Sequence, residues 1–119
     1  MLLIVGGESS GKRTFAQSLG YTDNDIADAV LNECPVLYHL EQMVFANPDG
    51  TDALLTALED KEVVICNEVG SGVIPANRAE RVGREATGRL CVLLAQRANC
   101  VVRMVSGIPV VIKGDLPCR

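Results

Sequence analysis

The chain has 119 residues, of which 48% are apolar and 22% are charged, and its formal net charge is −4. This composition predicts one folded domain over residues 1–119 and excludes a largely disordered chain. The acidic balance, without a cluster of basic residues, argues against nucleic acid as a partner. Since no apolar run is long enough to span a bilayer and the N-terminus lacks a secretory signal, a cytoplasmic protein without a membrane span is expected.

The first elements predicted along the chain are a strand, a glycine-rich loop and a helix. Residues 1–5 form a short apolar run that ends at two glycines, which is typical of a strand buried on both faces. Residues 12–19 then carry apolar side chains at helical spacing, and Gly20 ends that helix. The following stretch, DIADAVLNEC, is ambiguous, because it suits either a helix or a short strand at residues 29–33.

The second half continues the alternation of helices and strands. We predict a helix at 35–47 that begins with Pro35, a short helix at 52–58, and a buried strand at 63–66. The segment NEVGSGVIP is then a loop at the carboxyl end of that strand. A long helix follows at 77–99, and the runs 101–105 and 109–112 form either a hairpin or one bent strand. This order predicts an α/β domain with a mainly parallel sheet in three layers.

The loop after the first strand matches the pattern G-x-x-x-x-G-K of a phosphate-binding P-loop. Its backbone N–H groups would surround a phosphate, the lysine would neutralise it, and the helix N-terminus would add its dipole. A structural glycine turn is the alternative, but the position between a strand and a helix favours the P-loop. The predicted nucleotide-binding residues are Gly6, Gly7, Glu8, Ser9, Ser10, Gly11, Lys12, Arg13 and Thr14, and Lys12 is also a candidate catalytic residue.

Arg13 departs from this pattern, which has Ser or Thr at that position to coordinate Mg²⁺. Arginine cannot bind a cation, and Thr14, one residue later, is expected to point away from the site. Arg13 could contact a phosphate or face solvent. Mg²⁺ is the expected cofactor of a P-loop, but Arg13 argues against it here, and no residue is assigned as a certain metal ligand.

Other charged residues are candidates for the same site. Glu68 follows a buried strand and is a candidate catalytic acid, while Glu33 could end another strand; a solvated strand-end acid is the alternative for both. Arg78 and Arg81 could hold a phosphate or a phosphorylated substrate, or they could lie on a solvated helix face.

Cysteine and histidine provide little further evidence of a site. The five cysteines form no C-x-x-C pair, which fits neither a disulfide framework nor a zinc site. Cys34, Cys66, Cys91 and Cys100 are expected to be small buried thiols, and the tail thiol Cys118 is uninformative. His39 has no Cys or acidic partner at ligand spacing, so a surface or partly packed histidine is expected.

The segment VVICNEVGSGVIPANRAERVGREATGRL, followed by VVRMVSGIPVVIK, resembles the bifunctional adenosylcobinamide kinase/adenosylcobinamide-phosphate guanylyltransferase family. VGGESSGK is similar to the glycine-rich loop of that family, and LNECPVLYHLEQMVFAN is weakly similar to a strand that ends in an acid-Cys pair and the helix after it. The resemblance implies a P-loop, RecA-like fold, a homo-oligomer, binding of GTP or ATP, and a corrinoid substrate. It favours a strand at residues 29–34 and places Glu33 on an acid that contacts the nucleotide.

The family phosphorylates adenosylcobinamide and then transfers GMP through a guanylylated histidine, late in cobalamin biosynthesis. The segment that carries this histidine has no counterpart between Gly20 and about Ala29, and GRLCVLLA lacks a polar N-Q pair of the family. We therefore predict a nucleotide-binding relative in which guanylyl transfer is lost. The alternative is a non-catalytic binding or regulatory subunit that keeps the fold without turnover.

Overall fold

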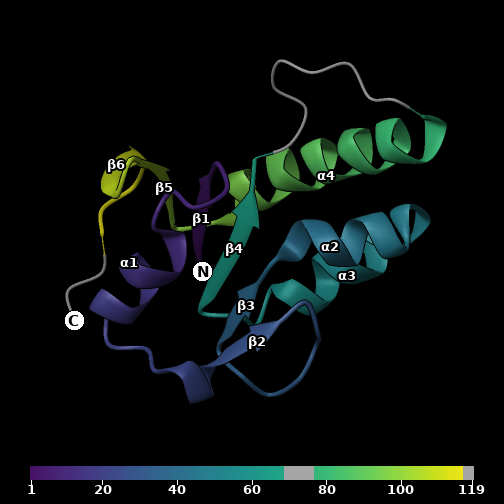
Figure 1. Ribbon diagram of the computed structural model, residues 1–119. Helices are drawn as coiled ribbons and strands as arrows, with labels where there is room; N and C mark the ends of the chain where they lie inside the picture. The colour runs from purple at the N-terminus through teal and green to yellow at the C-terminus, as the bar shows by residue number, and fades with distance from the viewer. Residues whose placement is uncertain (69–76, 117–119) are drawn as a thin grey trace.

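The computed structural model describes residues 1–68 and 77–116. These residues form one α/β unit around a six-stranded sheet with the strand order β2-β3-β4-β1-β5-β6 (Figure 1). The first five strands in that order are parallel, and the edge strand β6 is antiparallel to β5. In chain order the strands are β1 (Leu2–Gly6), β2 (Ile26–Asp28), β3 (Val36–Tyr38), β4 (Val63–Asn67), β5 (Cys100–Val105) and β6 (Ile108–Lys113).

Helices cover both faces of the sheet, so the fold has three layers (Figure 1). One face packs against α1 (Lys12–Ser18), and the other packs against α2 (Leu40–Ala46), α3 (Thr51–Leu58) and α4 (Arg78–Arg97). Short 3₁₀ turns lie at Asp23–Asp25 and Pro48–Gly50. Within the described residues no helix is long and apolar enough to cross a membrane.

The sequence prediction is confirmed where the apolar pattern is continuous. The predicted strands at 1–5 and 63–66 are β1 and β4, and the long helix at 77–99 is α4, whose residues Ala86, Leu90 and Leu94 are buried. The last two runs form the hairpin rather than a bent strand, and its turn residues Ser106 and Gly107 both have positive φ. The predicted α/β class with a mainly parallel sheet is correct.

Two predicted elements are wrong, and both lie on the β2–β3 side of the sheet. The helix expected at 35–47 begins only at Leu40, because Val36 and Leu37 lie in a strand and are buried on opposite faces of the sheet. The strand expected at 29–34 lies earlier, at Ile26–Asp28. Short apolar runs suit a helix or a strand equally well, so their periodicity could not decide.

The connection between β2 and β3 is short for two adjacent parallel strands. Residues 29–35 join them without a helix, whereas such a crossover usually needs a dozen or more residues. Lys61 holds this loop in place: its buried ammonium donates hydrogen bonds to the carbonyl oxygens of Asn32 and Cys34, each 2.6 Å long. Because β2 and β3 have only three residues each, a short loop is enough to return the chain to the amino edge of the sheet.

Candidate functional site

Polar side chains gather at the edge of the sheet where the parallel strands end. The register aligns Gly6 of β1 with Asn67 of β4 and Met104 of β5. On the other side, Asp28 at the end of β2 pairs with Tyr38 at the end of β3. In open α/β sheets this carboxyl edge is where ligands bind, so these strand ends define the candidate site.

The glycine-rich loop, residues 6–12, starts at this edge and leads into α1. Gly11 precedes the helix with φ of 92°, a left-handed conformation that favours glycine. The loop is fixed against the β5–β6 turn, because the N–H of Gly107 donates a 3.0 Å hydrogen bond to the carbonyl oxygen of Ser10. At Gly6 an added Cβ would lie 2.9 Å from the carbonyl oxygen of Met104, so a larger residue would displace the loop.

Lys12 lies beneath the loop and is the buried cation of the site. The residue is only 3% exposed, and its Nζ donates a 2.5 Å hydrogen bond to the carbonyl oxygen of Gly7. The hydroxyl of Ser10 lies 3.4 Å from the same nitrogen. Burial lowers the pKa of Lys12 below its usual value, although the negative charge of Glu41 acts in the opposite direction. A phosphate in the loop would stabilise this ammonium.

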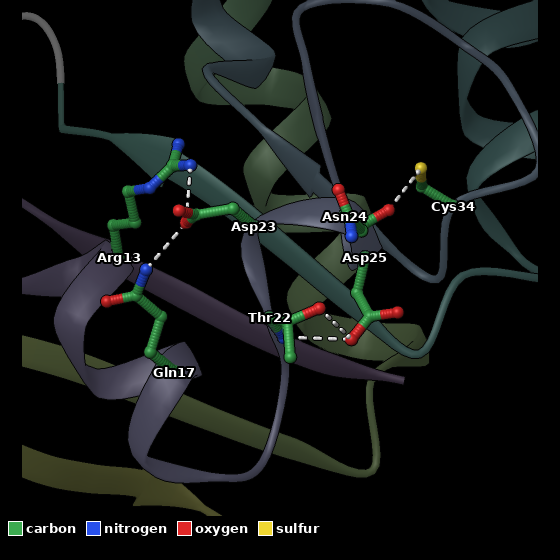
Figure 2. Close-up of polar contacts among 7 residues, drawn as sticks. All are labelled: Arg13, Gln17, Thr22, Asp23, Asn24, Asp25 and Cys34. Atoms are coloured by element: carbon green, nitrogen blue, oxygen red, sulfur yellow. Dashed lines mark hydrogen bonds and ion pairs between the residues drawn. The ribbon is translucent and has the colours of Figure 1, made fainter.

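Arg13, one residue beyond the loop, forms an ion pair with Asp23 (Figure 2). Its guanidinium donates a 3.0 Å hydrogen bond to Asp23, which also accepts one of 2.8 Å from Gln17. The guanidinium carbon lies 5.3 Å from the centre of the Tyr38 ring. In this arrangement Arg13 joins α1 to the turn before β2, and its contact with a phosphate stays a prediction.

We expect the contact between Arg13 and Asp23 to stabilise the protein only above acidic pH. The hydrogen bond from Arg13, and to a smaller extent the one from Gln17, lowers the pKa of Asp23 from its ordinary value of 3.8. The contact therefore contributes in full above pH 3.8 and is lost as the pH falls through the lower, folded-state pKa. Carboxyl-detected NMR titration of Asp23 in the parent and in Arg13→Gln tests this. The pKa should rise in the variant, and an unchanged pKa would contradict the assigned cause.

Glu41, in the first turn of α2, is the buried acid of the site. The residue is 8% exposed, and its Oε1 accepts a 2.9 Å hydrogen bond from the backbone N–H of Asn67. Its Oε2 lies 3.4 Å from the side-chain nitrogen of Asn67. Glu41 makes the largest favourable charge contribution to the ammonium form of Lys12. The sequence prediction missed this residue, because Glu41 was placed inside a longer helix rather than just after a strand.

Replacing Glu41 with Ala should destabilise the protein by about 1 to 3 kcal/mol, because the N–H of Asn67 loses its partner in a partly buried place. Glu41→Gln is the matched control, since its amide oxygen can still accept that hydrogen bond while the charge is gone. Chemical denaturation of both variants and the parent measures the difference. Equal destabilisation by Ala and Gln would mean that the charge, and not the hydrogen bond, is what matters.

Glu68 lies at the same edge, one residue beyond β4. Its backbone N–H donates a 2.8 Å hydrogen bond to the carbonyl oxygen of Gly6, which joins it directly to the start of the loop. Its carboxylate accepts two hydrogen bonds from Arg103 of β5, from Nε at 2.7 Å and from a terminal nitrogen at 3.1 Å. This fork-to-fork geometry fixes the carboxylate. The prediction of Glu68 near the loop is consistent with this placement, while Arg103 was not predicted.

His39 forms a pair with a carboxylate that the sequence spacing did not indicate. Its Nδ1 lies 2.6 Å from Oδ1 of Asp28, and its ring lies 3.8 Å, centre to centre, from that of Tyr38. The residue precedes α2 in a left-handed conformation, with φ of 59°. Asp28 ends β2 and His39 follows the neighbouring β3, so a correct assignment of these two strands would have brought the residues together.

Glu33 does not lie at this edge. It is exposed in the loop before β3 and lines a cavity of about 470 Å³ with Lys61 at the opposite, amino edge of the sheet. The expectation that Glu33 faces the glycine-rich loop is therefore wrong, and the cause is the misplaced strand. Arg78 and Arg81 are exposed in the first turn of α4. Glu8 in the loop and Thr14 in α1 are exposed.

The comparison with known proteins adds to this geometry. A sequence model described as cobinamide kinase / cobinamide phosphate guanyltransferase, CobU, matches residues 25–112. The chain belongs to this family. The match runs from the turn before β2 into β6 and covers the carboxyl-edge residues Asp28, His39, Glu41 and Glu68, but it begins after the glycine-rich loop.

Two curated relatives are similar over part of their length. Both are named bifunctional adenosylcobalamin biosynthesis protein CobU. The one from Escherichia coli K12 is 39% identical over 74 residues, which cover 62% of this chain and 41% of the relative. The one from Salmonella typhimurium LT2 is 35% identical over 107 residues, which cover 72% of this chain and 59% of the relative. The chain therefore spans less than two thirds of either relative.

Proposed function

We propose that this family member binds the phosphates of GTP or ATP in a P-loop formed by residues 6–12. The observation that carries the proposal is the buried ammonium of Lys12, which lies under a loop opening at the carboxyl edge of the sheet. Its present partners are the Gly7 carbonyl oxygen and the Ser10 hydroxyl, both of which are neutral. A phosphate oxygen would be a stronger partner, because hydrogen bonds between charged groups are stronger than those to neutral acceptors.

The site does not fit the usual Mg²⁺ arrangement of a P-loop. The hydroxyl that would bind the metal is replaced by Arg13, whose guanidinium is engaged by Asp23. Among the described residues no three His, Cys, Asp or Glu side chains gather in a way that would hold a metal ion. We therefore propose that this chain binds nucleotide through the loop and Lys12, with Glu41 and Glu68 as the nearby acids.

Guanylyl transfer is proposed to be lost. The family reaction uses a histidine in a segment that has no counterpart between Gly20 and about Ala29, where this chain has only the 3₁₀ turn Asp23–Asp25 and the three residues of β2. His39 is the sole histidine of the sequence, and it lies after β3 with its Nδ1 on Asp28. Incubation with GTP labelled at the α-phosphate should give no covalent label. A label that disappears in His39→Asn would overturn this proposal.

Nucleotide binding is tested by calorimetric titration of GTP and of ATP, each with and without Mg²⁺. We expect binding of at least one nucleotide with little dependence on Mg²⁺. If neither nucleotide binds at millimolar concentration, the P-loop proposal is wrong. A large gain in affinity with Mg²⁺ would instead refute only the part of the proposal that concerns Arg13.

A non-catalytic binding or regulatory subunit of cobalamin biosynthesis is the second proposal. It is supported by Arg13 at the metal-binding position of the motif and by the lack of the histidine segment between Gly20 and about Ala29. In this case the protein would be a cytoplasmic homo-oligomer that binds nucleotide without turnover. Phosphorylation of cobinamide by the purified chain alone would exclude it and would favour a retained kinase with a corrinoid site.

A further inference from the structure

Two cysteines from different elements meet beneath the carboxyl edge of the sheet. Cys66 lies in β4, and Cys91 lies in α4, 25 positions later. Their sulfur atoms are 3.6 Å apart and share a hydrogen bond. No other cysteine of the described residues forms a hydrogen bond with either of them, so the two sulfurs form an isolated dithiol pair.

The surroundings of the two thiols differ in a way that matters for their chemistry. Cys66 is fully buried, whereas Cys91 is partly exposed and lines an apolar cavity of about 390 Å³ between α4 and the sheet. The cavity wall includes Val5 and Val101 of the sheet and Ala95 of the helix. A small uncharged oxidant can therefore reach Cys91 first, and the sulfur of Cys66 already lies beside it.

The electrostatics favour the same order. The hydrogen bond with Cys66 lowers the pKa of Cys91, an effect that exceeds the opposing effect of burial. The same hydrogen bond, together with burial, raises the pKa of Cys66 well above its usual value. Since the thiolate is the reactive form of cysteine, and burial disfavours the charged form more strongly at the fully buried Cys66, Cys91 is assigned as the nucleophile of the pair.

We propose that Cys66 and Cys91 form a reversible disulfide when the protein meets a hydroperoxide, and that Cys91 is the thiol that reacts first. This inference is independent of the proposed nucleotide site. It assigns an oxidation site to the buried face of α4, and the resulting bond would join α4 to β4 directly before Asn67, whose N–H is bound to Glu41.

The chemistry balances in two steps. The Cys91 thiol gives up its proton, and its sulfur attacks the terminal oxygen of the hydroperoxide. An S–O bond forms, the O–O bond breaks, and the departing oxygen takes up that proton and leaves as an alcohol, or as water from hydrogen peroxide. The sulfur of Cys66 then attacks the sulfur of the Cys91 sulfenic acid. The S–S bond forms, the S–O bond breaks, and water departs with the proton of Cys66. The two thiols lose two electrons, and the hydroperoxide gains them.

The test is oxidation of the folded chain by hydrogen peroxide in a Cys118→Ser background, which removes the tail thiol. After the peroxide is destroyed, free thiols are counted in denaturant, and peptides are mapped without reductant. We expect the loss of two thiols, a linked peptide pair that contains Cys66 and Cys91, and full recovery with dithiothreitol. Unreacted thiols, or a Cys91 sulfenic acid that persists without a link, would overturn the proposal.

Single variants separate the two roles. In Cys66→Ser, a 1,3-diketone trap should capture a sulfenic acid on Cys91, because the partner sulfur is missing. In Cys91→Ser, the buried Cys66 should remain a free thiol. Cys34→Ser is the matched control: Cys34 is also partly exposed, but its sulfur contacts the carbonyl oxygen of Asn24, so the Cys66–Cys91 link should still form. A link that requires Cys34 would contradict the assignment.

Discussion

Lys12→Ala should weaken nucleotide binding by about 10- to 150-fold, which is the loss expected when a hydrogen bond between charged groups worth about 1.5 to 3 kcal/mol is removed. Lys12 is the buried cation beneath the glycine-rich loop, and its Nζ is already aimed at the loop through the carbonyl oxygen of Gly7. A phosphate seated on the loop would exchange this neutral acceptor for an anionic one. Isothermal titration with GTP and ATP measures the change.

The variant should bind poorly without being unfolded. Because burial lowers the pKa of Lys12, the charged lysine opposes folding at neutral pH, and its removal does not delete a stabilising ion pair. Lys113→Ala is the matched control, since this lysine also donates to backbone carbonyl oxygens, those of Ala95 and Gln96, but lies on β6. Equal affinity of the Lys12→Ala variant and the parent would exclude the loop as the phosphate site.

The parts of the fold that the sequence predicts are those in which each residue has only one compatible environment. Residues 2–6 and 63–67 are buried on both faces, and only central parallel strands give that pattern in such short runs. Over 20 residues of α4 the apolar stripe leaves no alternative to a helix. The glycine-rich loop was placed correctly because it lies between such elements.

The errors arise where tertiary contacts decide between a helix and a strand. Val36 and Leu37 have apolar neighbours at helical spacing, but in the fold they bridge the two cores on opposite faces of the sheet. That bridging requires β4 beside them, which no local pattern reveals. The strand expected at 29–34 placed Glu33 at the wrong edge of the sheet, and the helix expected at 35–47 concealed the positions of His39 and Glu41 just after a strand.

The contacts of the site were hidden for a related reason. Asp28 and His39 are 11 residues apart, and Glu41 and Asn67 are 26 apart, so no helical or strand spacing brings either pair together. What joins them is that each pair lies at or just beyond the ends of neighbouring parallel strands. A sequence reader could find such pairs only after the strands and their order were correctly assigned.

Leu90→Ala should destabilise the protein by about 2 to 5 kcal/mol, the range for deleting most of a fully buried leucine side chain. Leu90 is 1% exposed and lies in the core cluster that holds α4 against the sheet, with Leu3 and Val64 among its members. α4 also carries Cys91, and it follows β4, which ends at the candidate site. The loss should appear in urea denaturation as a lower midpoint at an unchanged slope.

Leu93→Ala is the matched control for this prediction, because Leu93 lies on the same helix but is 39% exposed. We expect the control to lower the free energy of unfolding by less than about 1 kcal/mol, since less apolar surface returns to water. Nucleotide affinity, measured well below the midpoint, should match the parent in both variants, because neither leucine contacts the loop. If Leu93→Ala proved as destabilising as Leu90→Ala, the exposed face of α4 would have to be covered in solution. A second copy of the chain packed on that face would then be the first explanation to test, by sedimentation.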